Sequence, residues 1–271
     1  MYKRMLALLT LLLAGTALAG NIPAATPEKE APQHTLRLVT YNVGVFNKYL
    51  KDDYRLVADI LLRERPDAVC LNELDSCTVR TGRVFQLERI AGLMGDWSFC
   101  FGAAMPFGGG SYGDGVMTRA EILCAERTVL PQAGGAEPRA LTIVETAEWI
   151  LAATHLDHLS DAAQLEQVRA IDSLVARFAA GVSKPVFLAG DMNAVPDSET
   201  LRALGRRWLL LTPTGEGTYP AEQPDRCIDY IFAWRGGVPC RVVEARVLRH
   251  SAAGDLRRAS DHLPVLLEVA W

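Results

Sequence analysis

The residues best suited to chemistry in this chain lie at positions 185–194, which read PVFLAGDMNA. An apolar run of strand length stops at Gly190, and Asp191 and Asn193 follow just beyond it. A buried strand fixes the backbone while the loop leaves the side chains free, so these two side chains could bind a hard cation and a phosphate oxygen together. An Asx turn that only caps a strand end has the same pattern, so this segment needs support from elsewhere in the chain.

Five other apolar runs begin or end at acidic, amide or imidazole side chains in the same way. Such repetition is not expected from unrelated turns, and it indicates one site assembled from several strands. Besides Asp191 and Asn193, the side chains placed in this way are Asn42, Asn72, Glu73, His155, Asp157, Asp229, Asp261 and His262.

Residues 1–19 have the pattern of a secretory signal peptide. Lys3 and Arg4 precede an apolar stretch over residues 5–14, and the sequence ALA ending at residue 19 provides a small-x-small cleavage site. The apolar stretch is too short to span a bilayer comfortably as a helix. We therefore expect this segment to be removed and the protein to be exported, either to a periplasm or out of the cell.

The region after the predicted cleavage divides into two parts. Residues 20–34 are rich in Pro, Ala, Glu and Lys and carry almost no large apolar side chains, which predicts a flexible lead-in. No linker or repeat interrupts residues 35–271, which predicts one folded domain over this range. We expect a monomer without a transmembrane segment.

The charge balance bears on the partners of the exported chain. Without Lys3 and Arg4, 26 basic residues oppose 32 acidic residues. Proteins that hold DNA by its backbone usually present a basic face, because phosphate neutralisation supplies most of their affinity. The acidic balance disfavours a nucleic-acid partner without excluding a nuclease.

The cysteines give no framework for the fold. An even number in an exported protein permits disulfides, but the spacings match no metal motif and the sequence predicts no particular pair. Cys70 lies inside an apolar run and is expected to be a small buried residue. The six are Cys70, Cys77, Cys100, Cys124, Cys227 and Cys240.

Short apolar runs rich in Val, Ile and Phe, separated by Gly, Pro, Asp and Asn, predict many strands. Helical periodicity appears over residues 53–64, 84–94 and 162–180. Helices thus interrupt the strands, yet many strands follow one another directly. This order predicts an α/β fold with two packed sheets between layers of helices.

Seven of these segments together resemble the endonuclease/exonuclease/phosphatase family of metal-dependent phosphoesterases. The resemblance runs in order through VTYNVGVF, DAVCLNELD, YGDGVMTR, ATHLDH, LAGDMNAVPDSE, CIDYIF and SDHLPVLLEV. It implies a four-layered α/β/β/α sandwich of two mixed sheets, with the site at one edge between the sheets.

The resemblance also implies a divalent metal, Mg²⁺ or Mn²⁺. Glu73 would be its principal ligand, helped by Asn42, and Asp261 would either bind a metal or hold the catalytic pair in place. Mg²⁺ prefers oxygen donors and is commonly held by a few carboxylates together with water and substrate phosphate.

The catalytic roles implied by the resemblance fall to five residues. Asp229 and His262 would form a carboxylate–imidazole pair, in which the carboxylate orients the ring and stabilises its protonated form. Either His262 or Asp191 would deprotonate the attacking water. Asn193 and His155 would donate hydrogen bonds to phosphate oxygens where negative charge develops.

Several further residues could support the site. Arg139 occupies a position where relatives often have an arginine that faces substrate phosphate, a task that suits a guanidinium. Asp157 and His158 could support the site from behind. A buried salt bridge is expected for Arg119 and a packed ring for Tyr112, and the polar loop at residues 81–83 could line the pocket.

The function implied is an exported phosphodiesterase that uses direct attack of water, without a covalent intermediate. Its substrate could be a lipid head group, a glycerophosphodiester, an inositol phosphate or a small nucleotide, because loops rather than the fold set specificity. Two alternatives remain at this point: an exported nuclease, and a member of the family that binds a phosphorylated ligand without catalysis.

Overall fold

The computed structural model describes residues 34–47, 53–95 and 97–271, and these contain two six-stranded mixed sheets. The first sheet has the order β11-β12-β1-β2-β4-β3, in which only β1 and β2 run parallel. Its strands are β1 (Thr35–Asn42), β2 (Ala68–Ser76), β3 (Ser98–Phe107), β4 (Gly110–Thr118), β11 (Arg241–Val247) and β12 (Val265–Ala270).

The second sheet has the order β5-β6-β7-β8-β10-β9, in which only β7 and β8 run parallel. Its strands are β5 (Cys124–Val129), β6 (Ala140–Glu145), β7 (Ile150–His155), β8 (Val186–Asp191), β9 (Trp208–Leu210) and β10 (Asp229–Trp234).

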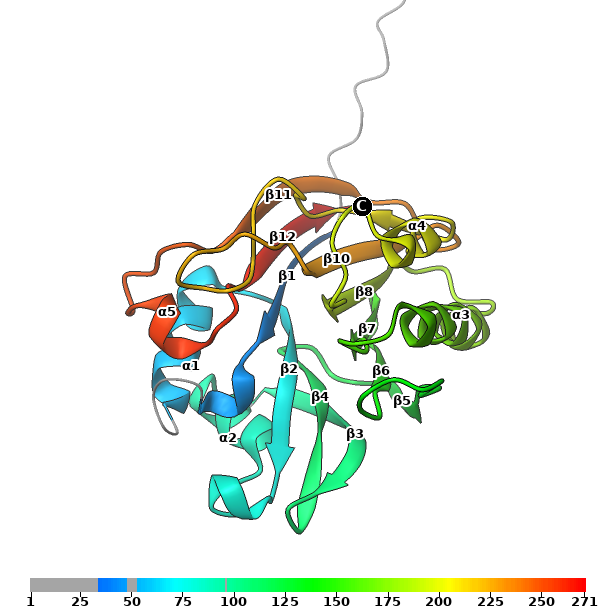
Figure 1. Ribbon diagram of the computed structural model, residues 1–271. Helices are drawn as coiled ribbons and strands as arrows, with labels where there is room; N and C mark the ends of the chain where they lie inside the picture. The colour runs from blue at the N-terminus through cyan, green and yellow to red at the C-terminus, as the bar shows by residue number, and fades with distance from the viewer. Residues whose placement is uncertain (1–33, 48–52, 96) are drawn as a thin grey trace, which may run out of the picture. The chain divides into compact units, whose positions relative to one another are not determined.

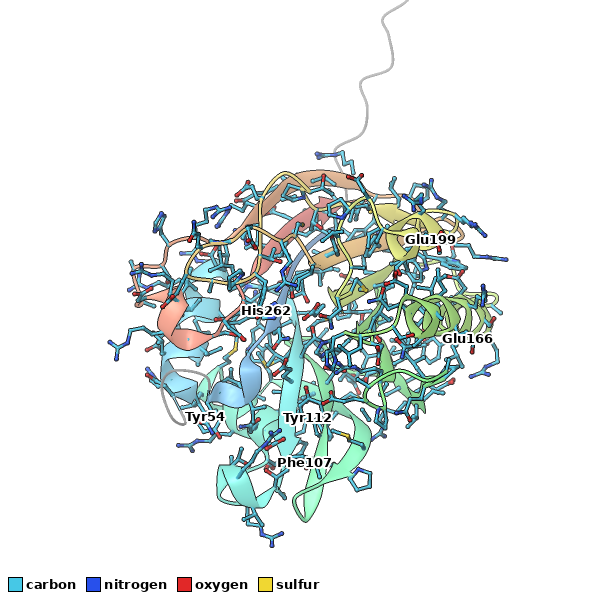
Figure 2. All side chains as sticks on the ribbon, in the orientation of Figure 1. Tyr54, Phe107, Tyr112, Glu166, Glu199 and His262 are labelled. Atoms are coloured by element: carbon cyan, nitrogen blue, oxygen red, sulfur yellow. The ribbon has the colours of Figure 1, made fainter. Side chains whose placement is uncertain are left out.

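Helices lie on the outer side of each sheet (Figure 1). The first sheet is covered by α1 (Tyr54–Glu64), α2 (Gln86–Leu93) and α5 (Leu256–Ala259), and the second by α3 (Asp161–Phe178) and α4 (Glu199–Leu204). Figure 2 shows Glu166 of α3 and Glu199 of α4 on this outer side of the second sheet. Two short 3₁₀ helices, η1 (Gly44–Phe46) and η2 (Val79–Thr81), follow β1 and β2. The predicted order of helix, sheet, sheet and helix is confirmed.

All three predicted helices form, and two of them, α1 and α3, begin at a side-chain cap. The side chain of Asp53 accepts a hydrogen bond from the Leu56 N–H at the start of α1, and Ser160 accepts one from the Ala163 N–H at the start of α3. These caps satisfy backbone donors that have no partner within the helix. The segment expected at residues 84–94 forms α2, which begins two residues later than the apolar pattern suggests.

The strand residues alternate between two cores, which explains how the sheets pack. In β1, Leu36 and Leu38 point into a core between the two sheets, whereas Val39 and Tyr41 point toward the helices of the first sheet. In β8, Phe187 and Ala189 enter the core between the sheets in the same way, and Val186 and Leu188 face α3 and α4. A strand that is buried on both faces reads as a continuous apolar run for this reason.

All six cysteine thiols, which lie within the described residues, are unpaired, so no disulfide joins the sheets. Cys70 is buried between the sheets as expected. The predicted signal peptide and all but the last residue of the predicted lead-in lie outside the described residues, and β1 begins at Thr35. None of the described helices is both long and apolar enough to cross a membrane.

Candidate active site

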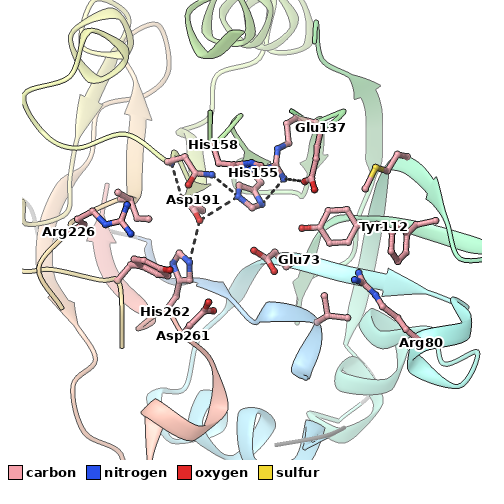
Figure 3. A pocket seen from close by; sticks show the side chains of 17 residues that line it. Glu73, Arg80, Tyr112, Glu137, His155, His158, Asp191, Arg226, Asp261 and His262 are labelled. Carbon is pink, nitrogen blue, oxygen red and sulfur yellow. Dashed lines mark hydrogen bonds and ion pairs between the residues drawn. The ribbon is translucent and has the colours of Figure 1, made fainter. Parts of the chain in front are cut away.

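A pocket of about 410 Å³ lies where the central strands of both sheets end (Figure 3). It brings together most of the side chains that the sequence singled out, from segments far apart along the chain. The predicted site residues that line it are Glu73, Arg139, His155, Asp191, Asn193, Asp261 and His262. Two others, Asn42 and Asp229, are buried behind this lining.

Strand register sets the row of acid and imidazole side chains on the second sheet. Asp191 at the end of β8 pairs with His155 of β7 on one side and with Asp229 of β10 on the other. All three continue the series of positions that face the first sheet, since Ala153, Ala189 and Ile231 two residues away lie in the core between the sheets. The Asp191 carboxylate therefore lies between the side chains of His155 and Asp229.

Asn42 and Asn72 form the matching row on the first sheet, where they are direct partners across β1 and β2. The Asn42 amide donates hydrogen bonds to the carboxylates of Glu73 and Asp191, each over 3.1 Å. Asn72 donates to the Thr154 carbonyl of β7 over 2.9 Å and accepts from the Asp191 N–H over 3.0 Å. Both side chains thereby join the two sheets at the floor of the pocket.

Glu73 reaches the pocket because β2 bulges there. The pairing with β4 shifts between Leu71 and Leu74, so Asn72 and Glu73 together oppose one residue, Asp114. Glu73 adopts a positive φ of 57°, which is uncommon for a residue with a side chain. Regular alternation would have turned Glu73 toward the helices, whereas the bulge aims it at Asp191 and Asp261 across the pocket.

Asp114 holds the bulge from behind. Its carboxylate accepts hydrogen bonds from the Asn72 amide over 2.9 Å and from the Glu73 N–H over 3.3 Å. Burial raises the pKa of Asp114 to about 6, although these hydrogen bonds favour its charged form. Nothing in the apolar pattern of the sequence marks this residue as part of the site.

A glycine is required where β8 meets the site. Gly190 has a φ of +148°, and a Cβ there would lie 1.8 Å from the carbonyl oxygen of Thr154. The close approach of β7 and β8 at this point brings His155 beside Asp191, with 3.5 Å between Nε2 and the carboxylate. The glycine in the sequence AGDMN is thus explained by packing within the sheet.

His262 and Asp229 form the predicted carboxylate–imidazole pair. Nδ1 of His262 lies 2.9 Å from the Asp229 carboxylate, and Nε2 lies 3.6 Å from that of Asp191. Burial disfavours the charged ring, but the nearby charges of Asp229 and Asp191 outweigh burial and raise the pKa of His262 to about 9. The ring of Tyr219 packs on the imidazole, with 4.7 Å between centroids.

The carboxyl group of Asp191 has a strongly raised pKa. Burial and the neighbouring negative charge of Asp229 raise its pKa to about 7, against the opposing effect of His262. An acid with such a pKa exchanges protons near neutral pH, which suits a general acid or base. The geometry therefore keeps both Asp191 and His262 within reach of one proton, and either could take it from water.

Arg139 is buried in the opposite wall, at the start of β6. Its guanidinium donates hydrogen bonds to Nδ1 of His155 and Nδ1 of His158, each over 3.2 Å, and lies 3.4 Å from the Glu137 carboxylate. Its Nε has no hydrogen-bond partner among the described residues. Asn193 completes this wall, with its amide 2.8 Å from Nε2 of His155.

Asp157 supports the loop that leads to Arg139. Its carboxylate accepts hydrogen bonds from the backbone N–H groups of Ala136, Leu159 and Ser160. Although burial opposes ionisation, these and related backbone donors hold the pKa of Asp157 below its usual value. The side chain thus ties two loops together behind the site, as the sequence suggested.

The donor set fits a divalent cation that binds oxygen. Glu73, Asp191 and Asp261 converge on the pocket, and a buried oxygen of Asp229 has no hydrogen-bond partner among the described residues. Asp191, Asp229 and His262 also place ligand atoms within 4.8 Å of one another. The Asp229–His262 hydrogen bond already occupies part of that group, and Glu73 and Asp261 bring two further carboxylates to the same pocket.

Some pocket residues were not expected from the sequence, and some expectations were wrong. Arg80, rather than residues 81–83, lines the pocket from η2. Tyr112 lines it as well, in addition to being a packed ring, and Arg119 forms an exposed rather than buried ion pair with Asp67. The further lining residues without a prediction are Val45, Met105, Phe107, Glu137, Tyr219, Arg226 and Ile228.

Comparison with known structures supports this fold. A mannosyl-6-phosphatase from Bacteroides thetaiotaomicron superposes with a TM-score of 0.72 at 16% identity, covering 87% of this chain and all of that one. An endonuclease/exonuclease/phosphatase from Beutenbergia cavernae superposes at 0.66 and 23% identity, covering 87% of this chain and 71% of that one. The human Nocturnin catalytic domain with bound sulfate superposes at 0.64 and 17% identity, covering 87% and 94%.

Sequence comparison identifies the family. A search of curated protein sequences finds no match. A family model described as endonuclease/exonuclease/phosphatase family matches residues 39–262, which span every strand-end side chain discussed above. The chain belongs to the endonuclease/exonuclease/phosphatase family, whose members hydrolyse phosphoester bonds.

Proposed function

We propose that this protein is an exported, Mg²⁺- or Mn²⁺-dependent phosphodiesterase that hydrolyses a small-molecule or lipid-head-group diester by direct attack of water. One observation carries the proposal: carboxylates for a metal and cationic groups for a phosphate face each other in a single pocket. Glu73 and Asp261 supply the first set, and Arg139 and the protonated ring of His262 supply the second, with the imidazole of His155 beside Arg139.

Each wall of the pocket has a part in this reaction. A divalent ion held by Glu73 and Asp261 would supply charge neutralisation and Lewis acidity at the phosphate. Arg139 and His155 hold non-bridging oxygens, where charge develops as the water attacks. Either Asp191 or the neutral form of His262 accepts the proton of the water, and Asp229 keeps the imidazole oriented through Nδ1.

The composition of the pocket favours water as the nucleophile. Among the described residues that line it, none is a serine, threonine or cysteine. The imidazoles of His155 and His262 both lie against Asp191, an arrangement suited to proton transfer. A serine, threonine or cysteine nucleophile is therefore not available in the described lining, and we assign the attack on phosphorus to water.

Size and charge favour a small substrate over a nucleic-acid polymer. The pocket volume of about 410 Å³ is typical of small-ligand sites. The whole chain carries a net charge of −4, and no continuous basic face is expected from such a balance. The same balance weighs against the exported nuclease.

The decisive experiment is a hydrolysis panel with purified protein in Mg²⁺, Mn²⁺ and chelator. It should contain bis-p-nitrophenyl phosphate, glycerophosphodiesters, a lipid head-group diester, plasmid DNA, RNA and simple phosphomonoesters. We expect metal-dependent cleavage of small diesters and none of the polymers. Cleavage of monoesters alone, as the name of the mannosyl-6-phosphatase neighbour would suggest, would contradict the diester part.

Two further outcomes concern the rest of the proposal. Absence of metal-dependent turnover on the whole panel would favour the catalytically silent alternative.

Export is tested separately, by locating the full-length chain and a chain lacking residues 2–19 in a secreting host and by sequencing the mature N-terminus. Retention of the full-length chain in the cytoplasm would contradict it.

A further inference from the structure

Three arginines line the pocket, and they differ in whether a carboxylate already neutralises them. Arg80 forms two hydrogen bonds, of 2.7 and 2.8 Å, with the buried carboxylate of Asp75. Arg139 lies 3.4 Å from Glu137. Arg226 has no carboxylate within ion-pair distance among the described residues, and it is exposed to the pocket mouth. Arg226 is the pocket cation whose charge no described carboxylate neutralises.

Arg226 is nevertheless held in place. Its guanidinium lies over the ring of Tyr219, 4.6 Å from the centroid, and its backbone pairs with that residue in both directions. Stacking on an aromatic face leaves the N–H edge of a guanidinium free to bind an anion. The stack thus positions the charge without consuming its hydrogen-bond donors.

The loop that carries this pair is anchored to the catalytic residues. The Thr218 hydroxyl accepts hydrogen bonds from the backbone N–H groups of Ile228 and Asp229. The Thr218 carbonyl accepts one from Leu263, and the Ala221 N–H donates to the Asp261 carbonyl, each over 2.7 Å. Both ends of the loop are therefore tied to the two segments that supply the Asp229–His262 pair.

The ring of Tyr219 fixes the direction from the reacting phosphate to Arg226. The ring centroid of Tyr219 lies 4.7 Å from that of His262 and 4.6 Å from the guanidinium carbon of Arg226, so both cationic groups contact one aromatic side chain. Figure 3 shows Arg226 on the His262 side of the pocket, away from Arg80 and Tyr112. A substrate held at His262 can extend past Tyr219 in this direction.

We infer that Arg226, stacked on Tyr219, is an anion-binding subsite for a second negatively charged group of the substrate, a phosphate or a carboxylate. The inference deepens the proposed function, because it takes the pocket to bind a phosphoester at His262. It makes the substrate a phosphoester with a further anionic group one aromatic ring away from the reacting phosphorus. Preorganisation of the guanidinium lowers the entropic cost of binding that group.

The test uses phosphonates, which bind as phosphate mimics and are not hydrolysed. Butylphosphonate carries one anionic group, 4-phosphonobutyrate adds a carboxylate, and butane-1,4-diphosphonate adds a second phosphonate. The six-carbon homologues of all three cover a longer spacing. Dissociation constants are measured by calorimetry in Mg²⁺ for the wild type, Arg226→Gln, Arg226→Lys and Arg63→Gln, a control that removes an exposed arginine of α1 outside the pocket.

We expect at least one probe with two anionic groups to bind the wild type about tenfold more tightly than its alkyl partner. Arg226→Gln should abolish this preference, Arg226→Lys should retain part of it, and Arg63→Gln should retain all of it. If the second phosphonate increases affinity more than the carboxylate does, the group bound by Arg226 is assigned as a phosphate. If the carboxylate increases affinity more, the group is assigned as a carboxylate.

Two results would overturn the inference. One is equal affinity of the wild type for the alkyl probes and for every probe with two anionic groups. The other is a preference that survives in Arg226→Gln, whose folding is checked by thermal unfolding. Since the probes are not hydrolysed, failure here leaves the hydrolysis panel unaffected, and a failed panel does not alter these binding measurements.

Discussion

The side-chain oxygen of Asn72 on the first sheet accepts a 3.0 Å hydrogen bond from the backbone N–H of Asp191 on the second. The same side chain donates to Asp114 and to the Thr154 carbonyl, so one buried amide connects the β2 bulge, β7 and β8. The carboxylate of Glu73, which we propose as a metal ligand, and the carboxylate of Asp191 are therefore positioned relative to each other through Asn72.

Replacing Asn72 should lower turnover more than a core substitution elsewhere that costs the protein a similar free energy of unfolding. Asn72→Ala leaves the buried Asp191 N–H and Asp114 carboxylate without these partners, which costs about 1–3 kcal/mol of unfolding free energy per unsatisfied group. We expect kcat to fall at least tenfold while the protein remains folded at low temperature. Urea unfolding and steady-state kinetics measure the two effects.

The matched control for Asn72→Ala is Ile171→Ala, on the buried face of α3. It should destabilise the protein by about 2–5 kcal/mol through lost packing alone and leave kcat of the folded protein unchanged. If both variants retained wild-type kcat, Asn72 would have no positioning role.

Glu73→Gln tests the metal ligand. The substitution removes a negative charge but keeps the size of the side chain, so we expect apparent Mg²⁺ affinity and turnover to fall together, each by tenfold or more. Activity titrated with Mg²⁺ and direct calorimetry of metal binding measure this. Glu88→Gln, on the exposed face of α2, is the control. Wild-type Mg²⁺ dependence in Glu73→Gln would exclude Glu73 as a ligand.

His262→Ala should lower kcat by roughly 10² to 10⁴, the range typical for loss of a general acid or base. Asp229→Asn should lower it nearly as much, because the amide neither stabilises the protonated ring nor enforces its orientation as a carboxylate does. Steady-state kinetics at saturating metal measure both, and circular dichroism verifies folding. An Asp229→Asn enzyme with wild-type kcat would show that the pair is not used.

The proton on His262 gives a prediction on pH. In metal-free protein, NMR titration of the His262 ring should give a pKa of about 9, against an ordinary value of 6.5. Asp229→Asn should lower the pKa, since the nearby carboxylate is the main group that raises it. Asp59→Asn, on α1, should leave it unchanged. A wild-type midpoint near 6.5 would contradict the prediction.

The same shift predicts the direction of a stability change. The folded state holds the His262 proton more tightly than the unfolded chain does, so the stabilisation from this group is complete below about pH 6.5 and is lost as pH rises through about 9. Urea unfolding of the metal-free wild type across this interval should show falling stability with rising pH. A rise in stability over the same interval would oppose this assignment.

The residue pattern alone predicts the strands, the alternation of their side chains and the chemistry at their ends. Apolar runs buried on both faces identify β1, β7, β8 and β10, and period-two alternation puts the side chains at their ends on one face of each strand. The repeated polar side chains at strand ends, together with the family resemblance, are why Asp191, His155 and Asp229 could be assigned to one site before their distances were known.

Which of these side chains face the pocket, and which residues lie beside them, depends on contacts between segments far apart in the chain. The bulge at Glu73 breaks the alternation because an extra residue is inserted opposite Asp114, and no local pattern marks it. Asn42 and Asp229 lie behind the lining because the sheets close over them. Arg226 is linked to His262 only through the ring of Tyr219, which contacts both, and the contact between Tyr219 and His262 is set by packing between distant segments rather than by residue spacing.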